Sequence, residues 1–220
     1  RKFEFMIENL SRKIIRAHLT APSEMKVGEE VLIRFDQTLT HDINAVMCYL
    51  AFEGVGIPRV RTEASVSYLD HNLLYIDSKT PDDHIFLQTL ARHYGIWLSR
   101  PGNGIMHSVQ LARFAIPGKT CLGTDSHTPS CGAVGMLAIG GGGMDGATAM
   151  TGVPLRIVMP KIVRVTLTGR LRPGVAAKDI VLDALSIYGD EYISILKTAF
   201  TDGWIDKYPN KGKKSGAYST

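Results

Sequence analysis

An aspartate and a histidine two residues apart, Asp125 and His127, lie in the run GTDSHTPS at residues 123–130. The run is rich in small residues, and four consecutive glycines follow at 140–143. A carboxylate near an imidazole can hold the ring in one tautomer and prepare it for proton transfer. The spacing is therefore typical of an active site.

Other histidines adjoin a carboxylate in His41–Asp42 and Asp70–His71, and a further one, His107, ends the GIMH segment without an adjacent carboxylate. Each lies where we expect a strand to end or a helix to begin, which is where α/β sheets present ligand-binding groups. We therefore expect these histidines and His127 to share one cleft. The remaining histidines are interpreted as structural residues: His18, His84 and His93.

The glycines at 140–143 could suggest a phosphate-binding loop, because backbone N–H groups of such loops bind anions. Their spacing fits neither GxGxxG with a following acidic residue nor a loop ending in GK[ST]. The sequence instead predicts close packing of a helix against the turn at 125–127.

Composition limits the class of protein. The chain has 220 residues, 45% hydrophobic and 21% charged, with a net charge of +4 to which lysines at 207–214 contribute strongly. The hydrophobic and charged fractions are typical of a globular domain. Because much of the positive charge lies in one short segment, it does not indicate a general nucleic-acid-binding surface, and we expect no nucleic-acid partner. No apolar run is long enough for a membrane span and no signal peptide is evident, so we expect no membrane association and a cytoplasmic location.

Three cysteines stand far apart in the sequence: Cys48, Cys121 and Cys131. They form neither a disulfide framework nor a CxxC pair for a metal. We predict that at least Cys48 and Cys121 are buried thiols that pack as small hydrophobic groups, and we expect no metal ligand among the three.

Short strands alternate with helices along most of the chain, which predicts an α/β domain with a mainly parallel sheet. A hydroxyl, a proline and two carboxylates at 80–83 indicate a helix start with Thr80 as cap, and Ile85, Phe86, Leu90 and Ala91 its buried face. The expected helices are 8–18, 42–52, 80–95, 107–114 and 178–185, and the expected strands are 31–35, 96–98, 119–122 and 158–168. A further helix is expected at 189–206, before a polar segment at 207–220.

Five segments together resemble the aconitase and isopropylmalate dehydratase hydro-lyases, in the family's order and spacing: DQTLTHD at 36–42, YLDHN at 68–72, RPGNGIMH at 100–107, GTDSHTP at 123–129 and PKIV at 160–163. The resemblance covers about residues 8–186. It implies a three-layer α/β domain, and a reaction that moves a hydroxyl group by dehydration and rehydration on a 4Fe-4S cluster.

The resemblance also implies roles for individual residues. The pairs Asp70–His71 and Asp125–His127 would handle protons around the substrate hydroxyl, with His107 as a further active-site histidine. Ser126 would contact a substrate carboxylate, and His41 would bind substrate. Aconitases have glutamine at the position of His41, where isopropylmalate dehydratases are more similar, whereas 36–40 and 100–107 are closer to bacterial aconitases. The substrate therefore stays open between citrate or isocitrate and an isopropylmalate-like acid.

None of the three cysteines matches a cluster ligand of the family, so we expect the cluster only in a complete enzyme. The expected partners are a small hydroxy-acid substrate and the missing aconitase domains or subunit. We expect no turnover from this chain alone. A non-catalytic binding or interaction module is the alternative from a different class.

The tail at 187–220, with the words WID and GKKSGAYS, resembles a segment of oligoendopeptidase F-type zinc metallopeptidases. No HExxH motif follows, which argues against proteolysis. The sequence thus suggests an aconitase-like domain at 1–186 and a foreign tail at 187–220, joined in a chimera near residues 186–189.

Overall fold

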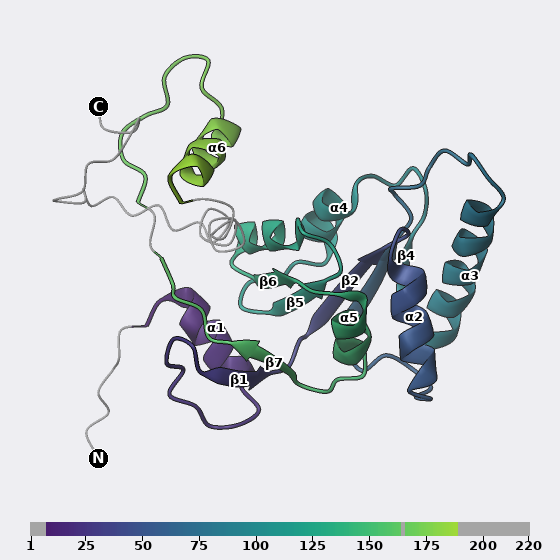
Figure 1. Ribbon diagram of the computed structural model, residues 1–220. Helices are drawn as coiled ribbons and strands as arrows, with labels where there is room; N and C mark the ends of the chain where they lie inside the picture. Colours follow the sequence, from purple (N-terminus) through teal and green to yellow (C-terminus); the bar gives the residue numbers. More distant parts are fainter. Residues whose placement is uncertain (1–7, 164–165, 189–220) are drawn as a thin grey trace.

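The computed structural model describes residues 8–163 and 166–188. Its centre is a five-stranded sheet with helices on both faces (Figure 1). The strands are β2 (Gln37–His41), β3 (Ala64–Tyr68), β4 (Trp97–Ser99), β5 (Thr120–Gly123) and β6 (Leu137–Gly140). They lie in the order β4-β3-β2-β5-β6, and every neighbouring pair is parallel. The predicted α/β class with a mainly parallel sheet is confirmed.

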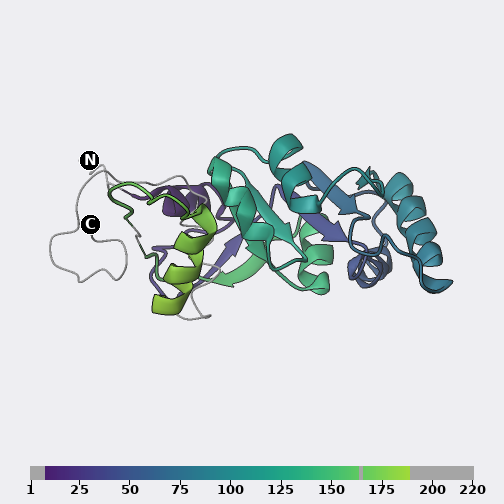
Figure 2. The ribbon, with the colours of Figure 1, turned by 90° about the horizontal axis from the view of Figure 1, so that it is seen from above.

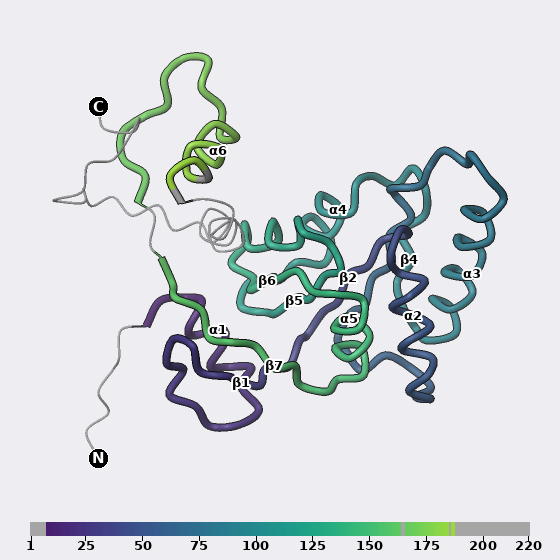
Figure 3. Tube along the Cα trace, in the orientation of Figure 1, coloured from purple at the N-terminus to yellow at the C-terminus, as the bar shows by residue number. Residues whose placement is uncertain are grey.

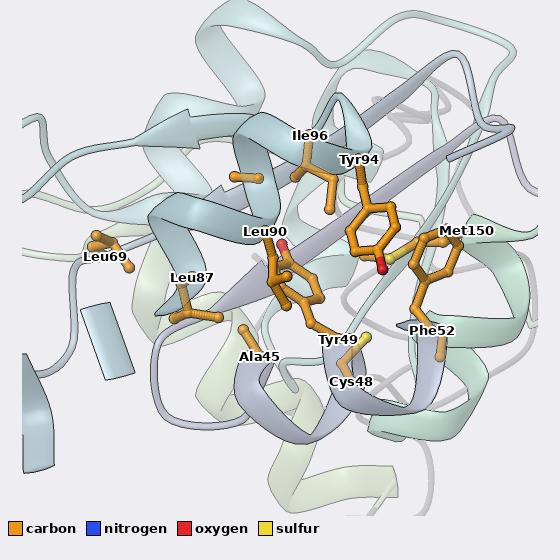
Figure 4. Close-up of a cluster of buried hydrophobic side chains, with 12 residues drawn as sticks. Ala45, Cys48, Tyr49, Phe52, Leu69, Leu87, Leu90, Tyr94, Ile96 and Met150 are labelled. Atoms are coloured by element: carbon orange, nitrogen blue, oxygen red, sulfur yellow. The ribbon is translucent and has the colours of Figure 1, made fainter. Parts of the chain in front are cut away.

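Two layers of helices cover the sheet. On one face, α2 (Ala45–Gly54), α3 (Lys79–Tyr94) and α5 (Gly143–Met150) enclose a core built around Tyr49, Phe52 and Tyr94 (Figure 4). On the other face, α4 (Met106–Arg113) and the 3₁₀ helix η1 (Thr128–Val134) pack on Leu39 and other strand residues. The three-layer arrangement expected from the family resemblance is therefore present.

A smaller, two-stranded sheet joins distant parts of the chain. Strand β1 (Glu30–Ile33) pairs antiparallel with β7 (Leu155–Val158), and the two lie side by side in the trace of Figure 3. Helix α1 (Leu10–His18) packs with these strands in a separate hydrophobic cluster. Helix α6 (Ala177–Tyr188) lies at the opposite end of the molecule from α3 (Figures 1 and 2).

The last strand differs from its prediction. A strand was expected at 158–168, but β7 ends at Val158, and no further strand occurs in the described residues of that range. The N–H of Met159 still donates to the carbonyl of Glu29, with an N···O distance of 2.8 Å. Pro160 follows without an N–H, so the ladder cannot continue through it.

The start of α3 also differs. The helix begins at Lys79, and Asp77 Oδ1 accepts hydrogen bonds from Thr80 N at 3.0 Å and Thr80 Oγ1 at 3.2 Å. Thr80 is therefore a donor within the first turn and not the cap. Ile85 is 62% exposed, because His84 and Leu87 take the buried face that the prediction gave to it.

Strand β2 was not predicted as a strand because four of its five residues are polar: Gln37, Thr38, Thr40 and His41. All five are nevertheless buried. Gln37 Nε2 donates to the Phe114 carbonyl at 2.8 Å, and the hydroxyl of Thr40 lies 2.9 Å from that of Tyr49. Because these polar side chains have hydrogen-bond partners inside the protein, a polar central strand can be buried.

The helix expected at 189–206 and the polar segment at 207–220 lie outside the described residues.

Candidate functional site

The site lies at the carboxyl ends of the central strands. The chain crosses from β2 through β3 to β4 on one side and returns to β5 on the other side of β2. Strand order reverses at this point, and open α/β sheets bind ligands there, outside the strand ends. The last residue of β2 and the loops after β3 and β5 supply most of the predicted site residues: His41, Asp70, His71, Asp125, Ser126 and His127.

Asp125 is the centre of the first group. Its Oδ1 lies 2.8 Å from His107 Nε2, at the start of α4, and 3.3 Å from His127 Nδ1. The backbone N–H of His127 donates to the same oxygen at 2.7 Å. Two imidazoles thus share one carboxylate, and the hydroxyl of Ser126 lies 3.1 Å from His127 Nδ1.

The surroundings set the protonation of this group. Burial opposes ionisation of Asp125, but the N–H of His127 and the neighbouring imidazoles outweigh it, so the pKa of Asp125 is lowered. Burial also lowers the pKa of His107, against the opposing effect of Asp125. An ionised carboxylate beside an imidazole that readily gives up its proton is suited to proton transfer.

Asp70 and His71 form the second group. Asp70 Oδ1 accepts from His71 Nδ1 at 2.8 Å, and Asp70 Oδ2 accepts from the N–H of Met106, the first residue of α4, at 2.7 Å. The positive end of a helix favours a carboxylate at this place. Asp70 therefore links the His71 ring to the helix that carries His107.

His41 connects the two groups. Its ring stacks on His71, with centroids 4.1 Å apart, and its Nε2 lies 3.6 Å from Asp125 Oδ2. Burial lowers the pKa of His41, and His71 lowers it further. The structure thus brings together every predicted site residue: His41, Asp70, His71, His107, Asp125, Ser126 and His127.

A buried carboxylate behind the site holds the loop that follows β3. Asp42 accepts from the backbone N–H of His71 at 3.1 Å and of Asn72 at 2.8 Å. His84, buried on α3, donates to Asp42 at 3.1 Å through Nε2, and its Nδ1 lies 3.0 Å from the Tyr75 hydroxyl. His84 is hydrogen-bonded inside the protein, as the structural interpretation predicted, and it supports the position of His71.

Sequence reasoning missed two supports of the site, Asn44 and the link from Asp42 to His84. Asn44 precedes α2, where asparagine is a common cap. Its side chain makes no cap hydrogen bond and reaches the end of β5 instead. Its spacing of three residues from His41 was the available signal, but the contact with residue 124 depends on strand order, which the sequence did not give.

The glycines pack closely, but the prediction that a helix packs against the turn at 125–127 is not met by this run: the turn is contacted by Gly140 of strand β6, and Gly143 at the start of α5 faces Cys48. A side chain at Gly140 would approach the Asp125 carbonyl to 3.1 Å, and one at Gly146 would approach Cys48 Sγ to 3.2 Å. Small residues at the end of β6 and on α5 therefore let the chain come close to the turn that carries Asp125.

The cysteines do not fit a 4Fe-4S cluster. All three are buried, Cys48 between α2 and its neighbours, and Cys121 and Cys131 in the cluster on the opposite face of the sheet. Burial raises the pKa of Cys48 to about 12 and of Cys131 to about 11. Cluster ligands are thiolates held together in space, so we assign these residues to packing.

Some donor sets are close enough for a metal ion, including His107, Asp125 and His127, whose ligand atoms lie within 4.8 Å of one another. In the structure these atoms contact one another directly. Among the described residues, no helix has both the length and the apolar character needed to cross a membrane.

Comparisons with known proteins identify the family of the chain. Residues 12–193 match the family described as "Aconitase family (aconitate hydratase)". The chain is 35% identical over 191 residues to a mitochondrial aconitate hydratase of Candida albicans, covering 80% of this chain and 24% of that protein. It is also 35% identical over 191 residues to the mitochondrial homocitrate dehydratase of Saccharomyces cerevisiae, with 78% and 24% coverage.

The chain thus spans about a quarter of the length of these curated relatives. The family match runs on to residue 193, past the junction suggested near 186–189, and the comparisons lend no support to a peptidase segment at 187–220. The relatives are mitochondrial proteins by name, which gives no support to the expected cytoplasmic location. The family match over residues 12–193 shows that this chain belongs to the aconitase family of hydro-lyases, and the α/β fold is consistent with it.

Proposed function

We propose that this chain supplies the proton-handling part of an aconitate hydratase active site, for a reaction that removes and restores water on citrate and isocitrate. The observation that carries the proposal is the position of Asp125, whose Oδ1 lies within 3.3 Å of a ring nitrogen of both His107 and His127.

Dehydration of a hydroxy acid needs a base to remove a proton from carbon and an acid to protonate the departing hydroxyl. A carboxylate with a lowered pKa stays ionised and stabilises the imidazolium that forms when a ring accepts a proton. His127 is exposed at the mouth of the site, so we assign it to proton exchange with substrate. His107 is more buried and contacts the same carboxylate, so it would hold Asp125 in position beside His127.

The second pair has the same organisation. His71 keeps 30% of its side chain exposed, while Asp70 is nearly buried and held by the N–H of Met106. A fixed carboxylate and an accessible ring form a second place where a proton can be held. With two such pairs in the site, one can serve as acid while the other serves as base.

Substrate assignment draws on the relatives. Those reported above act, by name, on aconitate and on homocitrate, which favours a tricarboxylic acid over an isopropylmalate-like acid. Ser126 is exposed beside His127, and a hydroxyl there can donate to a substrate carboxylate. His41 contributes to the wall of the site between the two pairs.

Enzymes of the aconitase family use a 4Fe-4S cluster. Because the cysteines present here do not fit one, we propose that the cluster and the remaining substrate contacts come from other parts of a complete enzyme, and that this chain alone has no turnover. The steps assigned above concern only binding and proton transfer by its own residues.

Ligand binding tests the proposal directly. Citrate, isocitrate, homocitrate and isopropylmalate are titrated into the ¹⁵N-labelled chain, with NMR shifts followed by residue. We expect tricarboxylic acids to shift His107, Ser126 and His127. Replacement Ser126→Ala should weaken binding roughly tenfold, as expected for a lost hydrogen bond to a charged group. His93→Gln on the far end of α3 is the control, and it should bind normally.

Turnover separates an enzyme part from a binding module. The segment is placed in the Candida albicans aconitate hydratase instead of its counterpart, and hydration of cis-aconitate is measured. We expect activity that falls roughly 10²–10⁴-fold with Asp125→Asn. Two results would contradict the proposal: hydration of cis-aconitate that is unchanged by Asp125→Asn, or a hybrid enzyme that acts on isopropylmalate and not on cis-aconitate.

A further inference from the structure

The amide of Asn44 has only one possible orientation. Its Nδ2 donates to the Thr124 carbonyl at 2.6 Å, and its Oδ1 accepts from the Thr124 hydroxyl at 2.6 Å. Turning the amide over would place Oδ1 against the carbonyl oxygen, two acceptors facing each other. Asn44, before α2, is therefore fixed by both groups of one residue at the end of β5.

The fixed amide decides which nitrogen of His41 carries the proton. The second hydrogen of Asn44 Nδ2 faces His41 Nε2 at 3.0 Å. A ring nitrogen that meets an N–H must accept, so Nε2 has no proton and the neutral ring carries it on Nδ1. His41 is 6% exposed, and its Nδ1 is buried with no partner in the described part of the chain.

This tautomer changes how the site shares its carboxylate. Nε2 of His41 lies 3.6 Å from Asp125 Oδ2, and with a proton it would become a third imidazole directed at Asp125. Without that proton it cannot donate there. The carboxylate of Asp125 is then left to His107 and His127, the two rings at 2.8 and 3.3 Å.

We propose that Asn44 is a positioning residue that holds His41 as the neutral Nδ1–H tautomer and so reserves Asp125 for His107 and His127. The role in catalysis rests on the function proposed above, whereas the tautomer is a property of this chain alone. His41 is thus a fixed polar wall of the site and takes no part in proton transfer.

Nitrogen NMR of the histidine rings tests the inference on the full chain. The seven histidines are labelled with ¹⁵N, and His41 is assigned by its absence in His41→Gln. Near neutral pH we expect His41 Nε2 to resonate in the unprotonated range and Nδ1 in the protonated range. Asn44→Asp has the same shape but cannot donate, so the proton should move to Nε2, which can then bond a carboxylate.

Two variants make the result specific. Asn72→Asp places the same charge near His71, and we expect the tautomer of His41 to stay unchanged. Thr124→Val removes the hydroxyl but keeps the carbonyl that orients Asn44, so the tautomer of His41 should stay as in the wild type. If Asn44→Asp does not fold, the ring spectrum of the wild type still decides.

A protonated Nε2 in the wild type would overturn the inference, as would equal effects of Asn44→Asp and Asn72→Asp. Neither result bears on whether citrate binds. Conversely, absence of citrate binding with the expected tautomer would defeat the proposed function and leave the assignment of Asn44 intact.

Discussion

Gly123, the last residue of β5, lies directly before the turn that carries Asp125. The Cβ of an alanine at this position would lie 2.6 Å from Thr128 Cγ2 and 2.7 Å from Leu39 Cδ1, and it would also overlap the Thr128 hydroxyl. Both neighbours are fully buried. We therefore predict that Gly123→Ala destabilises the fold and displaces the site turn.

The size of the effect follows from two contributions. Over-packing of a well-filled interior costs about 1–3 kcal/mol. Thr128 Oγ1 donates to the Asp125 carbonyl at 2.6 Å, and a rotation that avoids the new methyl loses this hydrogen bond, which is worth about 1 kcal/mol. The free energy of unfolding should fall by about 2–4 kcal/mol. For a chain of this size the corresponding fall in Tm is roughly 4–16 °C.

Urea unfolding followed by circular dichroism measures the change. The control is Gly54→Ala, because Gly54 ends α2 and an added Cβ there meets nothing within 4 Å. Alanine also favours a helix over glycine by up to about 1 kcal/mol, so this variant should be at least as stable as the wild type.

A double variant tests the cause. Thr128→Ala removes Oγ1 and Cγ2 of Thr128, two of the three atoms that the new methyl strikes, so the loss in Gly123→Ala/Thr128→Ala should be smaller than the sum of the single losses. Wild-type stability of Gly123→Ala, or strictly additive losses, would refute the steric argument.

Three further predictions concern the site and its supports. Asp42 is fully buried and accepts from two backbone N–H groups and from His84, so Asp42→Ala should cost about 3–5 kcal/mol in urea unfolding, and a loss below 1 kcal/mol would contradict the network. Burial lowers the pKa of His41 and His107, so the unfolded chain binds more protons than the folded chain in acid. The free energy of unfolding should therefore decline as the pH falls from about 7 to 5. His41→Gln should make that decline less steep, and an unchanged slope would count against a neutral His41. The three buried cysteines should react with a thiol reagent far more slowly in the native chain than in urea, and fast native labelling would show that they are accessible.

Periodic apolar residues made several helices and two strands of the fold predictable. Helices α2, α3 and α4 and strands β4 and β5 all lie within a few residues of their expected positions. Each carries apolar residues at a helical or strand-like spacing, or is bounded by glycine, as at Gly95, which ends α3 with φ 75°. Glycine is favoured in that left-handed conformation.

Strand β2 could not be found by the same reasoning. Its burial depends on partners elsewhere in the chain, such as Ser65 for Thr38 and Tyr49 for Thr40. A hydrophobic pattern reports only which residues avoid water by themselves. It cannot report polar residues whose hydrogen bonds are completed by other elements.

The candidate site was predictable as a set of residues, but its internal pairing was not. The sequence placed Asp125 with His127, its near neighbour, whereas the structure gives Asp125 a shorter contact with His107. That contact requires α4 to start beside the end of β5. Strand order, which sets this neighbourhood, leaves no local mark in the sequence.

The polar strand β2 also affects how the chain can fold during synthesis. Its two neighbours in the sheet are β3, about 25 residues later, and β5, about 80 residues later. One edge of β2 therefore stays unpaired during translation until β5 has been synthesised. A Val- or Ile-rich strand with an open edge would invite pairing with other chains. Gln37, Thr38 and Thr40 make that waiting edge a poor template for aggregation. The polar side chains that prevented the prediction of β2 as a strand should therefore also protect the nascent chain from aggregation until β5 pairs with β2.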